Sequence, residues 1–177
     1  MNDFNLNEEK NDLLGELDHL NSFIGFAKSL VKDRKIEKLL TSIQNDIFTI
    51  QANIAKPPNV LCLPDNISQN RILDIQKQTF LIEKGLKKIN HFILPEGTTA
   101  ACLIHCVRTI IRQVERKIPG YLKNPTNLSM YFDRVACLMF ALSRQINQKN
   151  GFAEQSPKYQ QSSSDLKKPP TTKRRNP

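Results

Sequence analysis

The sequence predicts an all-α protein, folded as a five-helix antiparallel bundle. Apolar residues recur at spacings of three and four through most of the first 150 residues, which is typical of amphipathic helices. Tryptophan is absent, glycine occurs 6 times and aromatic residues make up only 7% of the chain, so a β-sandwich or barrel is disfavoured. Short connections join the five periodic segments, and such connections favour antiparallel neighbours.

Two aliphatic stripes predict the first two helices. The second stripe stops before Pro57-Pro58, and its isoleucines would also suit a β-strand. Its spacing and its length favour a helix instead. The stripes are Leu13, Leu17, Leu20, Ile24 and Ala27, and then Ile36, Leu39, Leu40, Ile43, Ile47, Ile50 and Ile54.

Caps and prolines mark the other three helices. We expect a third helix from about Ser68 to Asn90. A fourth is capped by Thr98 or Thr99 and ends at Pro119-Gly120, and a fifth begins after Pro125. The expected core residues of the third and fifth helices are Ile72, Ile75, Leu86 and Ile89, and Val135, Leu138, Met139 and Leu142.

The composition changes near residue 150, so we expect a helical bundle over residues 1–150 and a disordered basic tail over 151–177. The tail is rich in Ser, Gln and Pro, and its six Lys or Arg and two Asp or Glu supply +4 of the net charge of +9. Its KKPPTTKRR stretch could contact nucleic acid or anionic lipid, but a solubilising role is favoured. Nucleic acid is therefore not an expected partner.

The chain has the features of a cytoplasmic protein without a membrane partner. No apolar run approaches the roughly 20 residues that span a bilayer. The first residues, MNDFNLNEEKND, resemble neither a secretory signal nor an Arg-rich transit peptide. The four cysteines are then expected to be reduced thiols: Cys62, Cys102, Cys106 and Cys137.

The fourth predicted helix carries Arg108, Arg112 and Arg116 at four-residue intervals. Two interpretations stay open for this arginine face. It could be a solvated face paired with Glu115, or an anion site, because guanidinium groups bind phosphate bidentately. Three of them span about 12 Å along the helix, enough for a polyphosphate. A helical wheel places Ala101, His105, Arg108, Arg112, Glu115 and Arg116 opposite Leu103, Val107, Ile110, Ile111, Val114 and Ile118.

One cluster on the same helix could suggest a metal, since Cys102, His105 and Cys106 lie within one turn. A fourth ligand would have to come from elsewhere, and both cysteines would serve as small core residues. We therefore expect no metal site.

Four motifs, in order, resemble those of the PduO-type ATP:cob(I)alamin adenosyltransferases. Residues 91–116, HFILPEGTTAACLIHCVRTIIRQVER, are similar to the family's Phe-x-Leu-Pro-Gly-Gly-Ser and Leu-His-x-x-Arg-Thr-x-x-Arg-Arg-x-Glu-Arg. The other three motifs are GELDHLNSFIGFAK, SIQNDIFTIQANIA and YFDRVACLMFALSR. The resemblance extends from about Leu14 to Arg144.

The resemblance implies an enzyme that assembles as a homotrimer with active sites between subunits. Its substrates would be ATP with Mg²⁺ and cob(I)alamin, and its products adenosylcobalamin and triphosphate. A cob(II)alamin reductase would be a further partner. The nucleophile would be Co(I) of the corrinoid, so the protein would position substrates and neutralise charge.

The resemblance also implies roles for individual residues. Asp18 and Arg108 match an ion pair across the subunit interface. Arg112 matches the arginine that contacts ATP phosphates. Phe92 matches the aromatic residue that packs under the corrin and displaces the lower axial base, so both Arg112 and Phe92 are expected to act in catalysis.

The remaining matched positions are charged. Glu115, with Arg116, matches residues that organise the nucleotide site. Asp133 stands where the family has an asparagine beside the phosphates, so it too is expected to line the cofactor site.

The sequence departs from the family pattern at the nucleotide site. Family members begin with Thr-Gly-Asp-x-Gly-x-Thr, a loop that holds ATP phosphates, and the fourteen residues before Gly15 contain no such motif. Two functions therefore stay open. One is the adenosyltransferase, as a divergent member of the family. The alternative is a non-catalytic corrinoid- or protein-binding bundle of the same descent.

Overall fold

The computed structural model describes residues 3–55, 67–121 and 126–159. This part of the chain contains five α-helices and no strand, so the predicted all-α, five-helix fold is confirmed. The helices are α1 (Asp3–Leu30), α2 (Arg34–Ala55), α3 (Gln69–Glu83), α4 (Thr99–Tyr121) and α5 (Thr126–Lys149).

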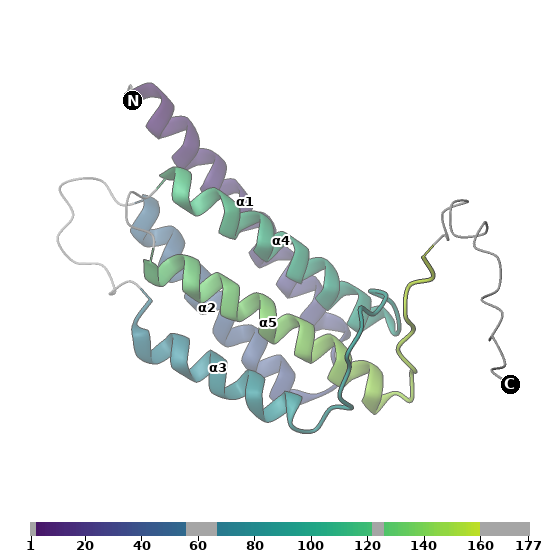
Figure 1. The fold of residues 1–177 in the computed structure, drawn as a ribbon. Helices are drawn as coiled ribbons and strands as arrows, with labels where there is room; N and C mark the ends of the chain where they lie inside the picture. Colours follow the sequence, from purple (N-terminus) through teal and green to yellow (C-terminus); the bar gives the residue numbers. More distant parts are fainter. Residues whose placement is uncertain (1–2, 56–66, 122–125, 160–177) are drawn as a thin grey trace, which may run out of the picture.

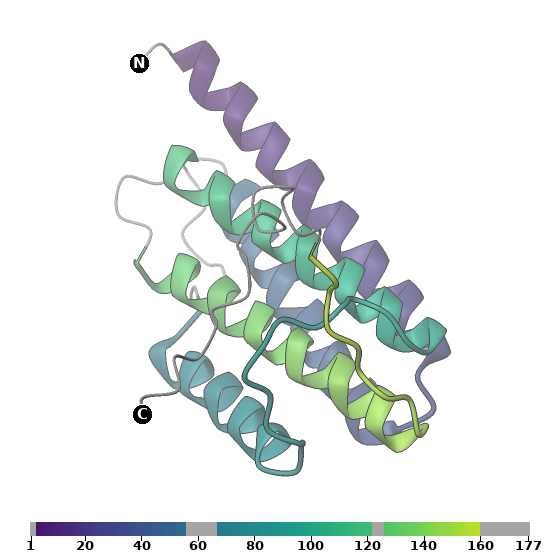
Figure 2. The same ribbon diagram turned by 45° about the vertical axis from the view of Figure 1, so that its right-hand side comes forward.

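Helix α4 packs against both α1 and α5, while α2 packs on α1 and α3 packs on α5 (Figure 1). Helices α1, α3 and α5 run in one direction and α2 and α4 in the other, so of these four contacts the α3–α5 contact alone joins parallel helices. The amino-terminal turns of α1 extend beyond the other helices (Figure 2). The start of α4 and the ends of α3 and α5 therefore lie at one end of the bundle, which we call the Thr99 end.

The predicted aliphatic stripes form the core. All five residues of the first stripe are at most 1% exposed, and those of the second are buried except Leu39, which is half-buried. The four predicted core residues of α5 are 0% exposed. Burial of such side chains supplies the main stabilisation, about 1.5–3 kcal/mol for each large aliphatic group. No helix in the described ranges has the length and apolarity to cross a bilayer.

One predicted helix end is wrong, and another is confirmed to within one residue. Helix α3 begins after the N-cap Ser68 but ends at Glu83 instead of Asn90, because Gly85 follows and residues 84–98 leave the helical path. Leu86 and Ile89 are consequently half-buried and do not join the core. Helix α4 ends at Tyr121, one residue beyond the predicted end at Pro119-Gly120, and its last turn includes Pro119, which has no backbone N–H to donate.

A partly buried polar network joins α2, α3 and α5. The Oδ2 atom of Asp46 accepts hydrogen bonds from Arg71 Nε and Tyr131 Oη, both at 2.8 Å. Arg71 also donates to Asp74 and to Ser42. Burial, together with the Asp46 carboxylate, raises the pKa of Tyr131 well above its ordinary value, so the hydroxyl stays a donor.

Candidate active site

The face of α4 that carries the arginines is partly covered by α5. His105 is only 5% exposed and Ala101 is fully buried, so their predicted place on the solvent face is wrong. Helix α5 covers this half of α4, and the ring of Phe140 lies 6.2 Å from that of His105. Solvent therefore reaches this face only from Arg108 onward, where Arg108 is half-buried and Arg112 and Arg116 are exposed.

His105 is uncharged at neutral pH. Burial, and then the nearby Arg108 guanidinium, lowers its pKa from 6.5 to about 4. Its Nδ1 atom is buried and has no hydrogen-bond partner among the described residues. A neutral imidazole adds no charge to the site.

Arg112 is the centre of a charge cluster between α4 and α5. Its Nη1 atom donates to Glu115 Oε2 at 2.8 Å and to Asp133 Oδ1 at 2.9 Å. The first contact lies within α4 and the second crosses to α5. The side chain is still 45% exposed, so both carboxylates hold a guanidinium that solvent can reach.

Arg116 does not join this cluster, although the sequence predicted that it would act with Glu115. Glu115 and Arg116 are adjacent in sequence, so their side chains point about 100° apart around the helix. Arg112 lies three residues before Glu115 and shares its face. Arg116 is exposed, and none of the described residues pairs with it. Arg112 therefore has partners on this face, whereas Arg116 has none within the described ranges.

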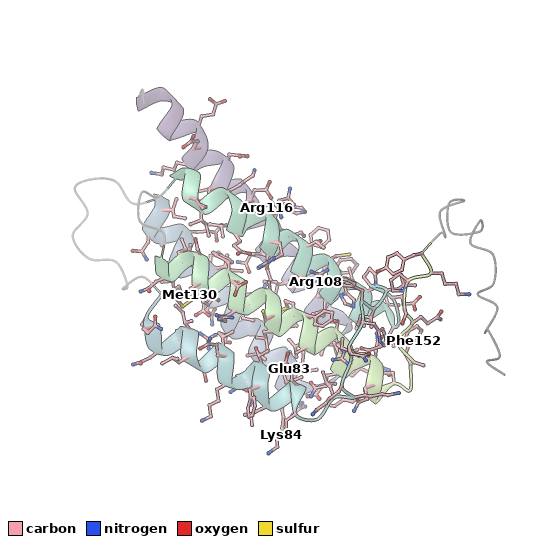
Figure 3. The ribbon with its side chains drawn as sticks, in the orientation of Figure 1. Glu83, Lys84, Arg108, Arg116, Met130 and Phe152 are labelled. Carbon is pink, nitrogen blue, oxygen red and sulfur yellow. The ribbon has the colours of Figure 1, made fainter. Side chains whose placement is uncertain are left out.

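Arg108 and Arg112 share a hollow of about 250 Å³ where α3, α4 and α5 meet. Figure 3 shows this face, with Arg108 on α4 and Glu83 at the end of α3 on either side of α5. Arg108 is half-buried, and its Nε atom is buried without a partner in the described ranges. The lining residues are Glu83, Arg108, Arg112, Asp133, Ala136, Cys137 and Phe140.

Asp18 lies on α1, where its side chain is exposed. No ion pair joins it to any described residue, Arg108 included. The described residues of one chain thus supply no ion-pair partner for either member of the expected interface pair.

Phe92 lies apart from the arginine hollow, on the segment 84–98 at the Thr99 end. Its side chain is 78% exposed, the highest value among the large apolar residues that the structure describes. It lines a second hollow of about 480 Å³ together with His91 and with Tyr159 from the segment after α5. Within a single chain the structure therefore does not bring Phe92 and Arg112 into one hollow.

Sequence reasoning missed Glu83 and Phe140 as lining residues. Helical spacing could have indicated Phe140, because Asp133, Ala136, Cys137 and Phe140 follow one face of α5. Glu83 could not be recognised as a helix-end residue, because the third helix was expected to continue to Asn90.

The two cysteines of the predicted cluster on α4 do not both pack in the core. Cys102 is half-buried and Cys106 is exposed, so the expected core packing of Cys106 is wrong. Over the described ranges no group of three His, Cys, Asp or Glu side chains could hold a metal ion.

Comparisons with known proteins place these features in a family. The cobalamin adenosyltransferase family model matches residues 7–146. A corrinoid adenosyltransferase of Mycobacterium leprae is 32% identical over 146 residues, covering 76% of each chain. The corrinoid adenosyltransferase of Bacillus subtilis is 27% identical over 150 residues, covering 79% of this chain and 75% of its own.

Solved structures share the fold. One is a PduO-type ATP:corrinoid adenosyltransferase from Lactobacillus reuteri with a phenylalanine replaced by alanine, complexed with cobalamin and ATP. It has a TM-score of 0.77 and 23% identity, and the match covers 85% of this chain and 87% of that one. An arginine-to-lysine variant from the same species, complexed with ATP, has a TM-score of 0.76. The family match over most of the chain and the Mycobacterium leprae relative show that this chain belongs to the cobalamin adenosyltransferase family.

Proposed function

We propose that this chain transfers the 5′-deoxyadenosyl group of ATP to Co(I) of a corrinoid, giving adenosylcobalamin and triphosphate. Family membership supports the reaction. The structural observation that carries the proposal is the Arg112 guanidinium, which is 45% exposed beside the hollow between α3, α4 and α5. A fixed, accessible guanidinium suits the phosphates of ATP.

The reaction needs no nucleophile from the protein. The electron pair of Co(I) forms a bond to C5′ of ATP, the C5′–O bond breaks, and triphosphate leaves with the bonding electrons. Negative charge grows on the leaving group, so a preorganised guanidinium lowers the barrier. Arg112 takes that role in our proposal, and Arg108 and Glu115 shape the field around it. Magnesium enters as MgATP, with phosphate oxygens among its ligands.

Asp133 must break its hydrogen bond to Arg112 when the phosphates bind. Its carboxylate occupies Arg112 in the unliganded chain and would repel a triphosphate. The other carboxylate oxygen, Oδ2, already lies 3.2 Å from Arg134 Nη1, so Asp133 has a second cation to pair with. We infer that Asp133 exchanges Arg112 for Arg134 as ATP enters.

Phe92 is proposed to pack against the lower face of the corrin and displace the axial base. Its exposure of 78% leaves the ring free to contact a ligand. In the two Lactobacillus reuteri variants the substituted phenylalanine and arginine are twenty residues apart, the same separation as Phe92 and Arg112. This equal spacing supports the pairing of the two roles.

Phe92 and Arg112 line separate hollows of one chain, and both could serve one active site if that site forms between subunits. We propose a homotrimer in which Asp18 of one chain pairs with Arg108 of the next. Arg108 is half-buried and its Nε lacks a partner among the described residues, so a carboxylate from outside would satisfy it. We further propose a cytoplasmic protein that receives its corrinoid from a cob(II)alamin reductase, with residues 1–150 as its helical-bundle domain.

An anaerobic assay with MgATP and chemically reduced cob(I)alamin tests the function. Adenosylcobalamin should appear by its absorption spectrum, with one triphosphate released for each corrinoid consumed. Corrinoid binding without product at any ATP concentration would contradict the proposal and support the non-catalytic alternative.

A further inference from the structure

The segment 84–98, which carries Phe92, has little structure of its own. All of it is described, and the one backbone hydrogen bond internal to residues 87–97 runs from Glu96 N to Leu94 O, at 2.9 Å. A loop with so few internal bonds takes its position from outside contacts. The position of Phe92 therefore depends on whatever holds the segment.

Two neighbouring elements supply the contacts on either side of Phe92. On the amino-terminal side, Arg144 Nη2 of α5 donates to the carbonyl oxygen of Lys87 at 2.7 Å. On the carboxyl-terminal side, Leu94 N donates to the carbonyl oxygen of Gln155 at 2.9 Å. The segment 84–98 and the residues after α5 run side by side at the Thr99 end (Figures 1 and 2).

Asn147 fixes the end of the same segment. Its Nδ2 donates to Glu96 O at 2.8 Å, and its Oδ1 accepts from Thr98 N at 3.1 Å. Gly97 has φ of +127°, and a Cβ atom there would overlap the Asn147 side chain. Only glycine permits this close approach.

The residues after α5 are held by a nearly buried ion pair. Glu154 accepts from Arg144 Nε at 2.7 Å and from Arg144 Nη2 at 3.0 Å. The Arg144 side chain is 8% exposed, and its guanidinium also lies 5.9 Å from the Phe140 ring centroid. Because a buried guanidinium needs its charge and its donors satisfied, loss of Glu154 should release both segments.

We infer that Arg144 and Glu154 are positioning residues that place Phe92 against the corrinoid, by fixing the segment 84–98 to α5 and to residues 152–155. The inference rests on the proposed role of Phe92. It gives a function in corrinoid binding to Glu154, a residue in the stretch that the sequence predicted to be a disordered tail.

The test compares three variants of the full chain with wild type: Phe92→Ala, Glu154→Ala and Lys149→Gln. Lys149 is the matched control, since it forms an ion pair on the same end of α5, with Asp33, and no hydrogen bond to the segment 84–98. The readouts are the absorption spectrum of cob(II)alamin with MgATP, KM for cob(I)alamin and for ATP, and trypsin cleavage after Lys87 and Lys88. Thermal unfolding confirms that each variant folds.

Phe92→Ala should abolish the four-coordinate cob(II)alamin signal. Glu154→Ala should weaken it and raise KM for cob(I)alamin about tenfold, with KM for ATP unchanged. It should also speed cleavage after Lys87 and Lys88, while Lys149→Gln behaves as wild type. Glu154→Asp should recover most of the loss, because it keeps the charge. If Glu154→Ala does not fold, Glu154→Gln is read in its place, since its amide oxygen keeps one acceptor for Arg144.

Two results would overturn the inference and are distinguishable. A wild-type spectrum and wild-type KM in Glu154→Ala, beside a loss in Phe92→Ala, would overturn the positioning role alone. A wild-type spectrum in Phe92→Ala would overturn the proposed role of Phe92, and the inference with it.

Discussion

Arg112 on α4 donates a hydrogen bond to Asp133 on α5, with 2.9 Å between Nη1 and Oδ1. This contact places a carboxylate on the guanidinium that we propose for the ATP phosphates. The two side chains are 45% and 35% exposed, so the pair is weak enough to exchange, at about 0.2–1 kcal/mol.

Asp133→Asn should therefore improve ATP binding. It removes a negative charge beside the phosphates and leaves the amide oxygen able to accept from Arg112. We expect KM for ATP to fall about three- to tenfold. Asp12→Asn is the control. It removes a carboxylate of α1 that pairs with Lys117 on α4, and Asp12 does not line the hollow. An unchanged or higher KM for ATP in Asp133→Asn would contradict the exchange of partners.

The network around Asp46 should contribute measurably to stability. Arg71→Leu removes the counter-charge from a carboxylate only 18% exposed, and should lower the free energy of unfolding by about 3 kcal/mol. Tyr131→Phe leaves Arg71 in place and should cost about 1 kcal/mol. Urea unfolding measures both free-energy changes. The reference is Lys149→Gln, which breaks the more exposed ion pair between Lys149 and Asp33. The interpretation fails if Arg71→Leu costs no more than that reference.

Assembly should depend on Asp18 and Arg108. Light scattering at micromolar concentration should give about 61 kDa, three times the chain mass of 20.3 kDa. Arg108→Glu should dissociate the trimer, because it places two carboxylates together at a desolvated contact. Arg116→Glu should not, since Arg116 is exposed and lies about two helical turns further along α4. A second change, Asp18→Arg, should restore the trimer in the Arg108→Glu background, and a monomeric wild type would refute the pairing.

His105 should make stability pH-dependent. Its pKa is lowered from 6.5 to about 4 in the folded chain. Between these two pH values the unfolded state therefore binds a proton at His105 that the folded state does not bind. The stabilisation is complete above pH 6.5 and is lost as the pH falls toward 4, by at most about 3 kcal/mol. His105→Gln should remove this part of the pH dependence of unfolding. Equal slopes in both proteins between pH 4 and 6.5 would show that His105 does not cause it.

The aliphatic stripes made the bundle predictable from sequence. Leu17 and Ile47 mark faces that are buried in any amphipathic helix of that period, whatever the neighbours are. Helix ends were less predictable, because Gly85 ends α3 where the apolar spacing would allow it to continue. The end of α4 was predictable to within one residue, because Pro119 and Gly120 both disfavour further helix.

The site was predictable in its residue types but not in its partners. Arg112 stood out through its spacing, yet its pairing with Asp133 depends on how α5 packs on α4. Burial of His105 depends on the same packing. Glu154 gave no signal at all, because its contact with Arg144 joins a polar stretch to the end of α5. Such contacts arise from tertiary structure and leave no periodic trace.

The measurement that tests the central claim most directly is the rate of adenosylcobalamin formation from MgATP and cob(I)alamin in Arg112→Ala beside Arg116→Ala. Arg116 is the matched control, because it is an exposed arginine on the same helix with no partner in the described chain. If Arg112 stabilises the leaving triphosphate, Arg112→Ala should lower kcat about 100-fold or more, with the trimer and the unfolding free energy nearly unchanged. Arg116→Ala should retain the wild-type rate. Equal rates in the two variants would contradict the assignment of Arg112 to the ATP phosphates.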